Sequence, residues 1–167
     1  MTAATFAPAR FRRIAPLIAP LLITIGATAT LTLLGHAMRG AGDDYHTPAW
    51  ALWIHLATVI PAVPLGAWVL WGPKGTRGHK AAGRVWALMM VVTAIDSFWI
   101  RGLTGGIGPI HIFSVLTLVS IPLGIFHVRR GNVAAHRRAM TGVYIGLFVA
   151  GGFAMMPGRL LWATVFG

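Results

Sequence analysis

The sequence predicts an all-α protein, a polytopic transmembrane helix bundle of about five spans. Hydrophobic residues make up 56% of its 167 residues and charged residues only 10%, whereas soluble domains carry roughly 25% charged residues. A span needs about 20 consecutive apolar residues, so the chain has room for five spans and short loops. We therefore expect residues 1–167 to form a single integral membrane domain.

Five apolar runs account for the expected spans. The first follows a basic tail, as in a cleaved signal peptide, but it is longer than the usual apolar region of such peptides and no convincing cleavage site follows it. We expect a retained helix there. The last run is interrupted by Pro157–Gly158, where a helix bends or ends. The runs are residues 14–35, 49–71, 85–100, 109–128 and 139–166.

Basic residues give the chain a net charge of +11 and are distributed unevenly. The N-terminal tail holds three and the connectors 72–84 and 129–138 hold four each, against three on the opposite side. Such an excess marks the cytoplasmic side. We expect a protein of the bacterial inner membrane with its N-terminus in the cytoplasm and its C-terminus outside. At span ends these charges favour anionic lipid headgroups as partners and disfavour nucleic acid.

Residues 49–103 and 109–167 look like two copies of one helix hairpin, and residues 1–48 precede them as tail, first span and outer loop. Three landmarks recur at offsets of 56, 58 and 57 residues. Two hairpins of the same orientation, related by an axis along the membrane normal, would form a four-helix core. The matched landmarks are Ile54-His55-Leu56 with Ile110-His111-Ile112, Pro64-Leu65-Gly66 with Pro122-Leu123-Gly124, and His79-Lys80-Ala81 with His136-Arg137-Arg138.

The duplication would arrange four histidines as two pairs. His55 and His111 would face one another near the outer side, and His79 and His136 would form a matching pair near the inner side. Histidines on facing helices can be the two axial ligands of a haem iron. We hypothesise that the protein binds haem b, with His55 and His111 as iron ligands, and passes electrons. The alternatives are a structural role for either pair and, for the inner pair, binding of an anion or a lipid headgroup.

Asp96 is the only acid inside an apolar run. An intramembrane carboxylate is costly and normally faces a partner or a cavity. Its partner could be Arg101, Arg159 or a histidine imidazole, and a carboxylate bonded to the second ring nitrogen of a histidine would orient that ring as a ligand. A structural pair and a proton-handling role both stay open. Asp96, Arg84 and Arg159 are therefore candidates to support the histidine site.

The two basic connectors resemble motifs of the bacterial membrane family DUF2306. Its members look like H-R-x-x-G-R-x-Y in the first connector and H-R-x-W-M in the second, and the resemblance covers roughly residues 50–160. It implies a multi-span fold and no assigned chemistry. The histidine layout, without any sequence motif, is also similar to that of cytochrome b561 proteins, which carry two haems in a four-helix core. His79, Arg84, His136 and Met140 match the DUF2306 motifs, whereas Lys80, Trp86 and Ala139 depart from them.

Two functional interpretations stay open. The first is transmembrane electron transfer by a b-type haem, and no other cofactor is expected. The second is a non-catalytic role, as an accessory subunit of a membrane complex or as a membrane protein that binds a small molecule, a lipid or a quinone. The absence of cysteine excludes disulfides, thiolate metal sites and cysteine nucleophiles. With three acids in the chain, an enzyme that acts on lipid is disfavoured, and no catalytic residue is identified.

Overall fold

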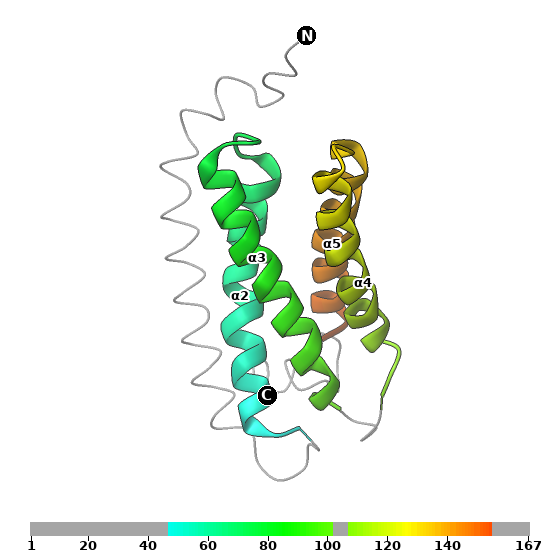
Figure 1. Cartoon of the computed structure of the whole chain (residues 1–167). Helices are drawn as coiled ribbons and strands as arrows, with labels where there is room; N and C mark the ends of the chain where they lie inside the picture. Colours follow the sequence, from blue (N-terminus) through cyan, green and yellow to red (C-terminus); the bar gives the residue numbers. More distant parts are fainter. Residues whose placement is uncertain (1–46, 102–106, 155–167) are drawn as a thin grey trace.

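The computed structural model describes residues 47–101 and 107–154, which form helices and no strand (Figure 1). The all-α prediction is confirmed for this part of the chain. The expected first span and Arg159 lie outside the described residues, as do Pro157 and Gly158. The elements are α2 (Ala49–Trp71), α3 (Arg77–Asp96), the short 3-10 helix η1 (Ser97–Trp99), α4 (His111–Arg129) and α5 (Val133–Ala154).

The four long helices run alternately up and down and form two antiparallel hairpins, α2 with α3 and α4 with α5 (Figure 1). The hairpins meet where α3 packs on α4 and α2 packs on α5. The expected pair of hairpins is thus confirmed. Helices α2 and α4 both begin at one end of the bundle, which we call the His55 end. Helices α3 and α5 both begin at the other end, which we call the Lys74 end.

Three of the four described helices are long and apolar enough to cross a bilayer: α2, α3 together with η1, and α4. Helix α5 is 22 residues long but has basic residues in its first two turns, and the predicted apolar run 139–166, which overlaps it, continues past the described residues. Large apolar side chains cover the outside of the bundle, as a lipid-facing surface requires. Examples with more than half of their surface exposed are Leu88, Leu116 and Phe148.

The connector at the Lys74 end is held by polar caps. Thr76 Oγ1 accepts a hydrogen bond from the backbone N–H of His79 at 3.0 Å and so caps the start of α3. The Lys74 ammonium donates to the carbonyl oxygen of Val69 at 2.9 Å and also to that of Leu70, in the last turn of α2. A cation is favourable there, because the C-terminal end of a helix carries partial negative charge. Gly75 supplies the positive φ of 74° that the turn between them needs.

The centre of the bundle is an aromatic clamp on α2. The Trp86 side chain is 1% exposed, and its indole N–H donates to the Ala62 carbonyl at 3.0 Å. The Tyr144 hydroxyl donates to the neighbouring Val63 carbonyl, also at 3.0 Å. Both rings reach α2 because Gly66 has no side chain: a Cβ there would lie 2.5 Å from Trp86 Nε1 and 2.6 Å from Tyr144 Cε2. Since Tyr144 belongs to the second hairpin, the clamp joins the two hairpins.

We expect Gly66→Ala to destabilise the bundle by about 1–3 kcal/mol, the usual cost of overpacking a core. Neither ring can yield without losing its hydrogen bond to α2. Gly142→Ala is the matched control, because a Cβ at Gly142 meets nothing within 4 Å and alanine is the better helix former. Thermal unfolding in detergent, followed by circular dichroism, measures both. Equal melting temperatures for the two variants would contradict the clamp.

Candidate functional site

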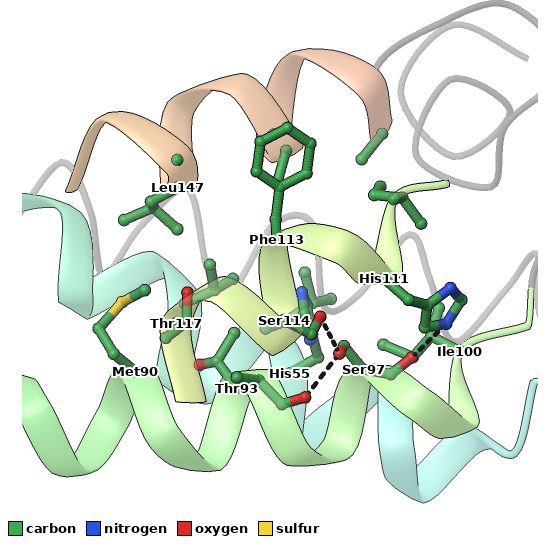
Figure 2. A pocket seen from close by; sticks show the side chains of 18 of the residues that line it. His55, Met90, Thr93, Ser97, Ile100, His111, Phe113, Ser114, Thr117 and Leu147 are labelled. Atoms are coloured by element: carbon green, nitrogen blue, oxygen red, sulfur yellow. Dashed lines mark hydrogen bonds between the residues drawn. The ribbon is translucent and has the colours of Figure 1, made fainter. Parts of the chain in front are cut away.

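A cavity of about 210 Å³ lies between all four helices in the half of the bundle nearest the His55 end (Figure 2). Its wall is mainly apolar, with hydroxyl and imidazole groups on one part of it. A mostly apolar cavity with a few convergent polar groups is the usual form of a small-molecule site. The polar lining residues are His55, Thr93, Ser97, His111, Ser114 and Thr117, and the apolar ones include Leu56, Met90, Phe113 and Leu147.

His55 and Asp96 form the central polar pair of this site. His55 Nδ1 lies 3.1 Å from Asp96 Oδ1, and Asp96 sits in the last turn of α3, with 6% of its side chain exposed against 26% for His55. Because a carboxylate oxygen only accepts, Nδ1 carries the proton. His55 lines the cavity and Asp96 does not, so the carboxylate lies behind the ring. Nε2 is then the nitrogen that the ring offers to the cavity.

The second oxygen of Asp96 is an unusual feature. Oδ2 is buried and has no hydrogen-bond partner among the described residues. Leaving a buried acceptor unpaired costs about 1–3 kcal/mol, and more for a charged group. Of the partners expected for Asp96, the structure thus shows the histidine imidazole. This one hydrogen bond gives a partner to Oδ1 alone.

His111 also lines the cavity, but its ring is held by backbone groups. Its Nε2 lies 3.2 Å from the Ser97 carbonyl oxygen and its Nδ1 lies 3.0 Å from the Gly108 backbone nitrogen. The two contacts fit one neutral tautomer, in which Nε2–H donates and Nδ1 accepts. The ring also stacks on Phe98, with centroids 5.6 Å apart. Figure 2 shows the bond from His111 to Ser97. Both nitrogens of His111 are therefore in use.

A set of hydroxyl groups completes the polar wall. Thr93 Oγ1 donates to Thr58 Oγ1 at 2.6 Å, which links α3 to α2. Ser97 Oγ lies 2.6 Å from Ser114 Oγ, which links η1 to α4 (Figure 2). Our sequence analysis did not single out these residues. The sequence does contain an indication of this wall: Thr93 and Ser97 are four residues apart, a spacing that places two residues on one face of a helix.

The structure separates the four predicted histidines into two groups. His55 and His111 line one cavity, but the nitrogens of His111 are bonded to the backbone. His79 and His136 lie at the Lys74 end, each within the first four residues of its helix. Arg84 is exposed on α3 and does not line the cavity. Haem ligation by either pair stays a prediction.

The described residues contain no cluster of three or more His, Asp or Glu side chains that could hold a metal ion. A haem iron needs only one or two imidazole ligands. The question is therefore whether the histidines and the volume of the cavity can accommodate a haem. His55 offers a single nitrogen, whereas His111 would have to give up a backbone hydrogen bond. The cavity of about 210 Å³ is also below the roughly 300–1,000 Å³ of sites for drug-sized ligands, and a porphyrin is larger than most of these. The residues in this arrangement do not fit a haem held by both histidines.

The apolar helices and their exposed apolar surface define the class of the molecule, a polytopic α-helical membrane protein. The chain belongs to the family described as predicted membrane protein (DUF2306), whose model matches residues 52–165. The resemblance seen in the two basic connectors is thereby confirmed, and the matched region covers both hairpins apart from the first three residues of α2. No curated protein and no solved structure matches the chain significantly.

The hydrogen bond between His55 and Asp96 predicts energetic coupling. In a double-mutant cycle of His55→Ala and Asp96→Ala, we expect the two effects on unfolding free energy to differ from additivity by about 0.5–3 kcal/mol, as is usual for directly bonded residues. A cycle of His127→Ala with Asp96→Ala is the control, because His127 lies in the last turn of α4 at the opposite end. Additive effects in both cycles would contradict the pair.

Proposed function

We propose that this protein binds a small amphipathic molecule with a hydroxyl-bearing ring, of the phenol or quinol type, in the cavity beside His55. The observation that carries the proposal is an imidazole oriented by a buried carboxylate at the wall of an apolar cavity. We place this site in a bundle of five spans in the bacterial inner membrane, with the N-terminus in the cytoplasm and the His55 end on the outer side. The uneven distribution of basic residues supports that orientation.

The polar wall favours a ligand that donates a hydrogen bond. With Nδ1–H bonded to Asp96, the neutral His55 ring can only accept at Nε2, so it pairs with a hydroxyl group and not with a carbonyl. A proton passed from that hydroxyl to Nε2 would make an imidazolium beside the Asp96 carboxylate, which stabilises the positive charge. The pair can therefore bind a hydroxyl and can also take its proton.

The size and lining of the cavity limit the rest of the ligand. A volume of about 210 Å³ accepts one substituted ring, and a longer apolar tail would have to extend between helices into the bilayer. Apolar side chains from all four helices, among them Leu56, Met90, Phe113 and Leu147, would enclose the ring. Burial of a ring in such surroundings contributes about 25 cal/mol for each Å² removed from water.

Haem b with electron transfer is the second candidate. Its support is the carboxylate-to-imidazole arrangement of Asp96 and His55, which is common behind metal-bound histidines. It requires either that His111 turns away from the Ser97 carbonyl oxygen or that the haem iron has a single histidine ligand. Protein purified from cells supplied with haem would then show a Soret band that His55→Ala abolishes. Absence of the band from the wild type would eliminate this candidate.

The proposal itself is tested by titration with decylubiquinol, a short-tailed quinol, against the purified chain in detergent. We expect saturable binding that His55→Phe weakens about tenfold or more, the loss of a hydrogen bond in a water-poor site. Ala94→Leu should also weaken binding, because Ala94 is 4% exposed and lines the cavity. Isothermal titration calorimetry measures all the affinities.

Leu116→Ala is the matched control for these variants, because Leu116 is on the same helix as four lining residues but is 54% exposed on the outside of the bundle. It should bind the quinol as the wild type does. No saturable binding by the wild type, or equal affinity of wild type and His55→Phe, would overturn the proposal and favour a non-catalytic accessory subunit.

A further inference from the structure

The polar wall of the cavity uses most of its hydroxyl protons within the protein. The Ser97 hydroxyl donates to the Ala94 carbonyl at 2.8 Å, so the proton in the 2.6 Å contact between Ser97 and Ser114 comes from Ser114. Thr93 donates to Thr58 at 2.6 Å. Because a hydroxyl group has one proton, none of these three lining residues has a proton left to donate to a ligand.

Thr117 is the exception in this wall. It is 8% exposed and lines the cavity. A threonine in an apolar helix often bonds a carbonyl of its own helix, as Thr58 does with Ile54 at 2.8 Å. The Thr117 hydroxyl makes no hydrogen bond within the described part of the chain, and no dashed line reaches it in Figure 2. Its proton is therefore free to be donated into the cavity.

His55 supplies the complementary group. Since Nδ1–H is bonded to Asp96 at 3.1 Å, Nε2 of the neutral ring can accept a hydrogen bond. His111 offers neither kind of group, because both of its nitrogens are bonded to the backbone. Among the described residues that line the cavity, one ring nitrogen is thus free to accept, on His55, and one hydroxyl proton is free to be donated, on Thr117.

The two groups reach the cavity from diagonally opposite helices. Helix α2 packs on α3 and α5, and α4 packs on the same two helices (Figure 1). Along the bundle, Asp96 marks the level of His55, and the next residue, Ser97, marks the level of Ser114. Thr117 follows three residues later in α4, about 4.5 Å farther from the His55 end. A ring in the cavity would therefore present opposite edges to His55 and Thr117.

We propose that the cavity selects a ring with oxygens at two opposite positions, a hydroquinone, and that Thr117 binds the second oxygen. One hydroxyl of the ligand donates to His55 Nε2, and the opposite oxygen accepts from the Thr117 hydroxyl. This inference rests on the proposed function, since it concerns the same cavity and starts from the same bond to His55. A phenol has a single oxygen and would leave the buried Thr117 proton without an acceptor, which is costly.

Two symmetrical probes test the inference. Duroquinol is a hydroquinone with four methyl groups, and the matching tetramethylphenol has the same methyl groups but lacks one of the two opposite hydroxyls. Each is titrated against the purified chain in detergent, without oxygen so that the quinol stays reduced, and isothermal titration calorimetry gives the affinities. We expect the wild type to bind duroquinol about tenfold more tightly, as for one further hydrogen bond in a water-poor site.

Variants of Thr117 assign this preference to its hydroxyl. Thr117→Val removes the hydroxyl at nearly constant shape, so it should abolish the preference for duroquinol and leave the affinity for the tetramethylphenol unchanged. Thr117→Ser keeps a hydroxyl and should keep the preference. Thr141→Val is the matched control, because Thr141 is half-buried on α5 and does not line the cavity. It should bind both probes as the wild type does.

The outcomes distinguish this inference from the proposed function. Binding of both probes that His55→Phe weakens supports the proposed function. Equal affinity of the wild type for both probes, or an unchanged preference in Thr117→Val, then overturns the role of Thr117 alone. A wild type that binds neither probe overturns both proposals. The comparison of the two probes on the wild type decides the inference even where Thr117→Val does not fold.

Discussion

A buried carboxylate inside an apolar helix bundle needs a partner, and the half of the bundle nearest the His55 end is organised around the partner that Asp96 has. The hydrogen bond to His55 joins α2 to α3, fixes which imidazole nitrogen carries a proton, and leaves the other nitrogen facing a cavity. In surroundings of low polarity such a bond is strong and its absence is costly. Among the described residues, the second carboxylate oxygen, Oδ2, is buried without a hydrogen-bond partner.

The centre of the bundle has a different construction. There Trp86 and Tyr144 donate to consecutive carbonyl groups of α2, and Gly66 makes room for both rings. The clamp connects the hairpins through α2 alone. At the related position of α4, Gly124 instead admits Met140 and the His136 ring. Gly66 and Gly124, two landmarks that match in the sequence, thus serve different contacts in the two hairpins.

Much of the architecture could be predicted from the sequence, because the apolar runs and basic connectors depend only on composition. The site could be predicted in part. Asp96 was expected to find a partner, but three partners were open, since a choice among them needs the relative rotation of α2 and α3. His111 was expected to face His55. Its position as the first residue of α4 instead lets its ring bond to the preceding backbone, a local contact that a pattern of residue types does not reveal.

The hydroxyl groups of Thr58, Thr93, Ser97 and Ser114 were not predicted because serine and threonine occur throughout apolar helices, where they often bond their own backbone. Only the packing of α2, α3 and α4 brings them together in pairs. Their presence beside His55 distinguishes a polar-walled cavity from a gap in an apolar core.

The central claim is that Asp96 sets the protonation of the His55 ring, and nitrogen NMR of the protein labelled with ¹⁵N-histidine tests it most directly. The account predicts a neutral His55 with a protonated Nδ1 and an unprotonated Nε2 in the wild type, and loss of that preference in Asp96→Asn. A proton on Nε2 of the wild type, or the same tautomer in Asp96→Asn, would contradict it.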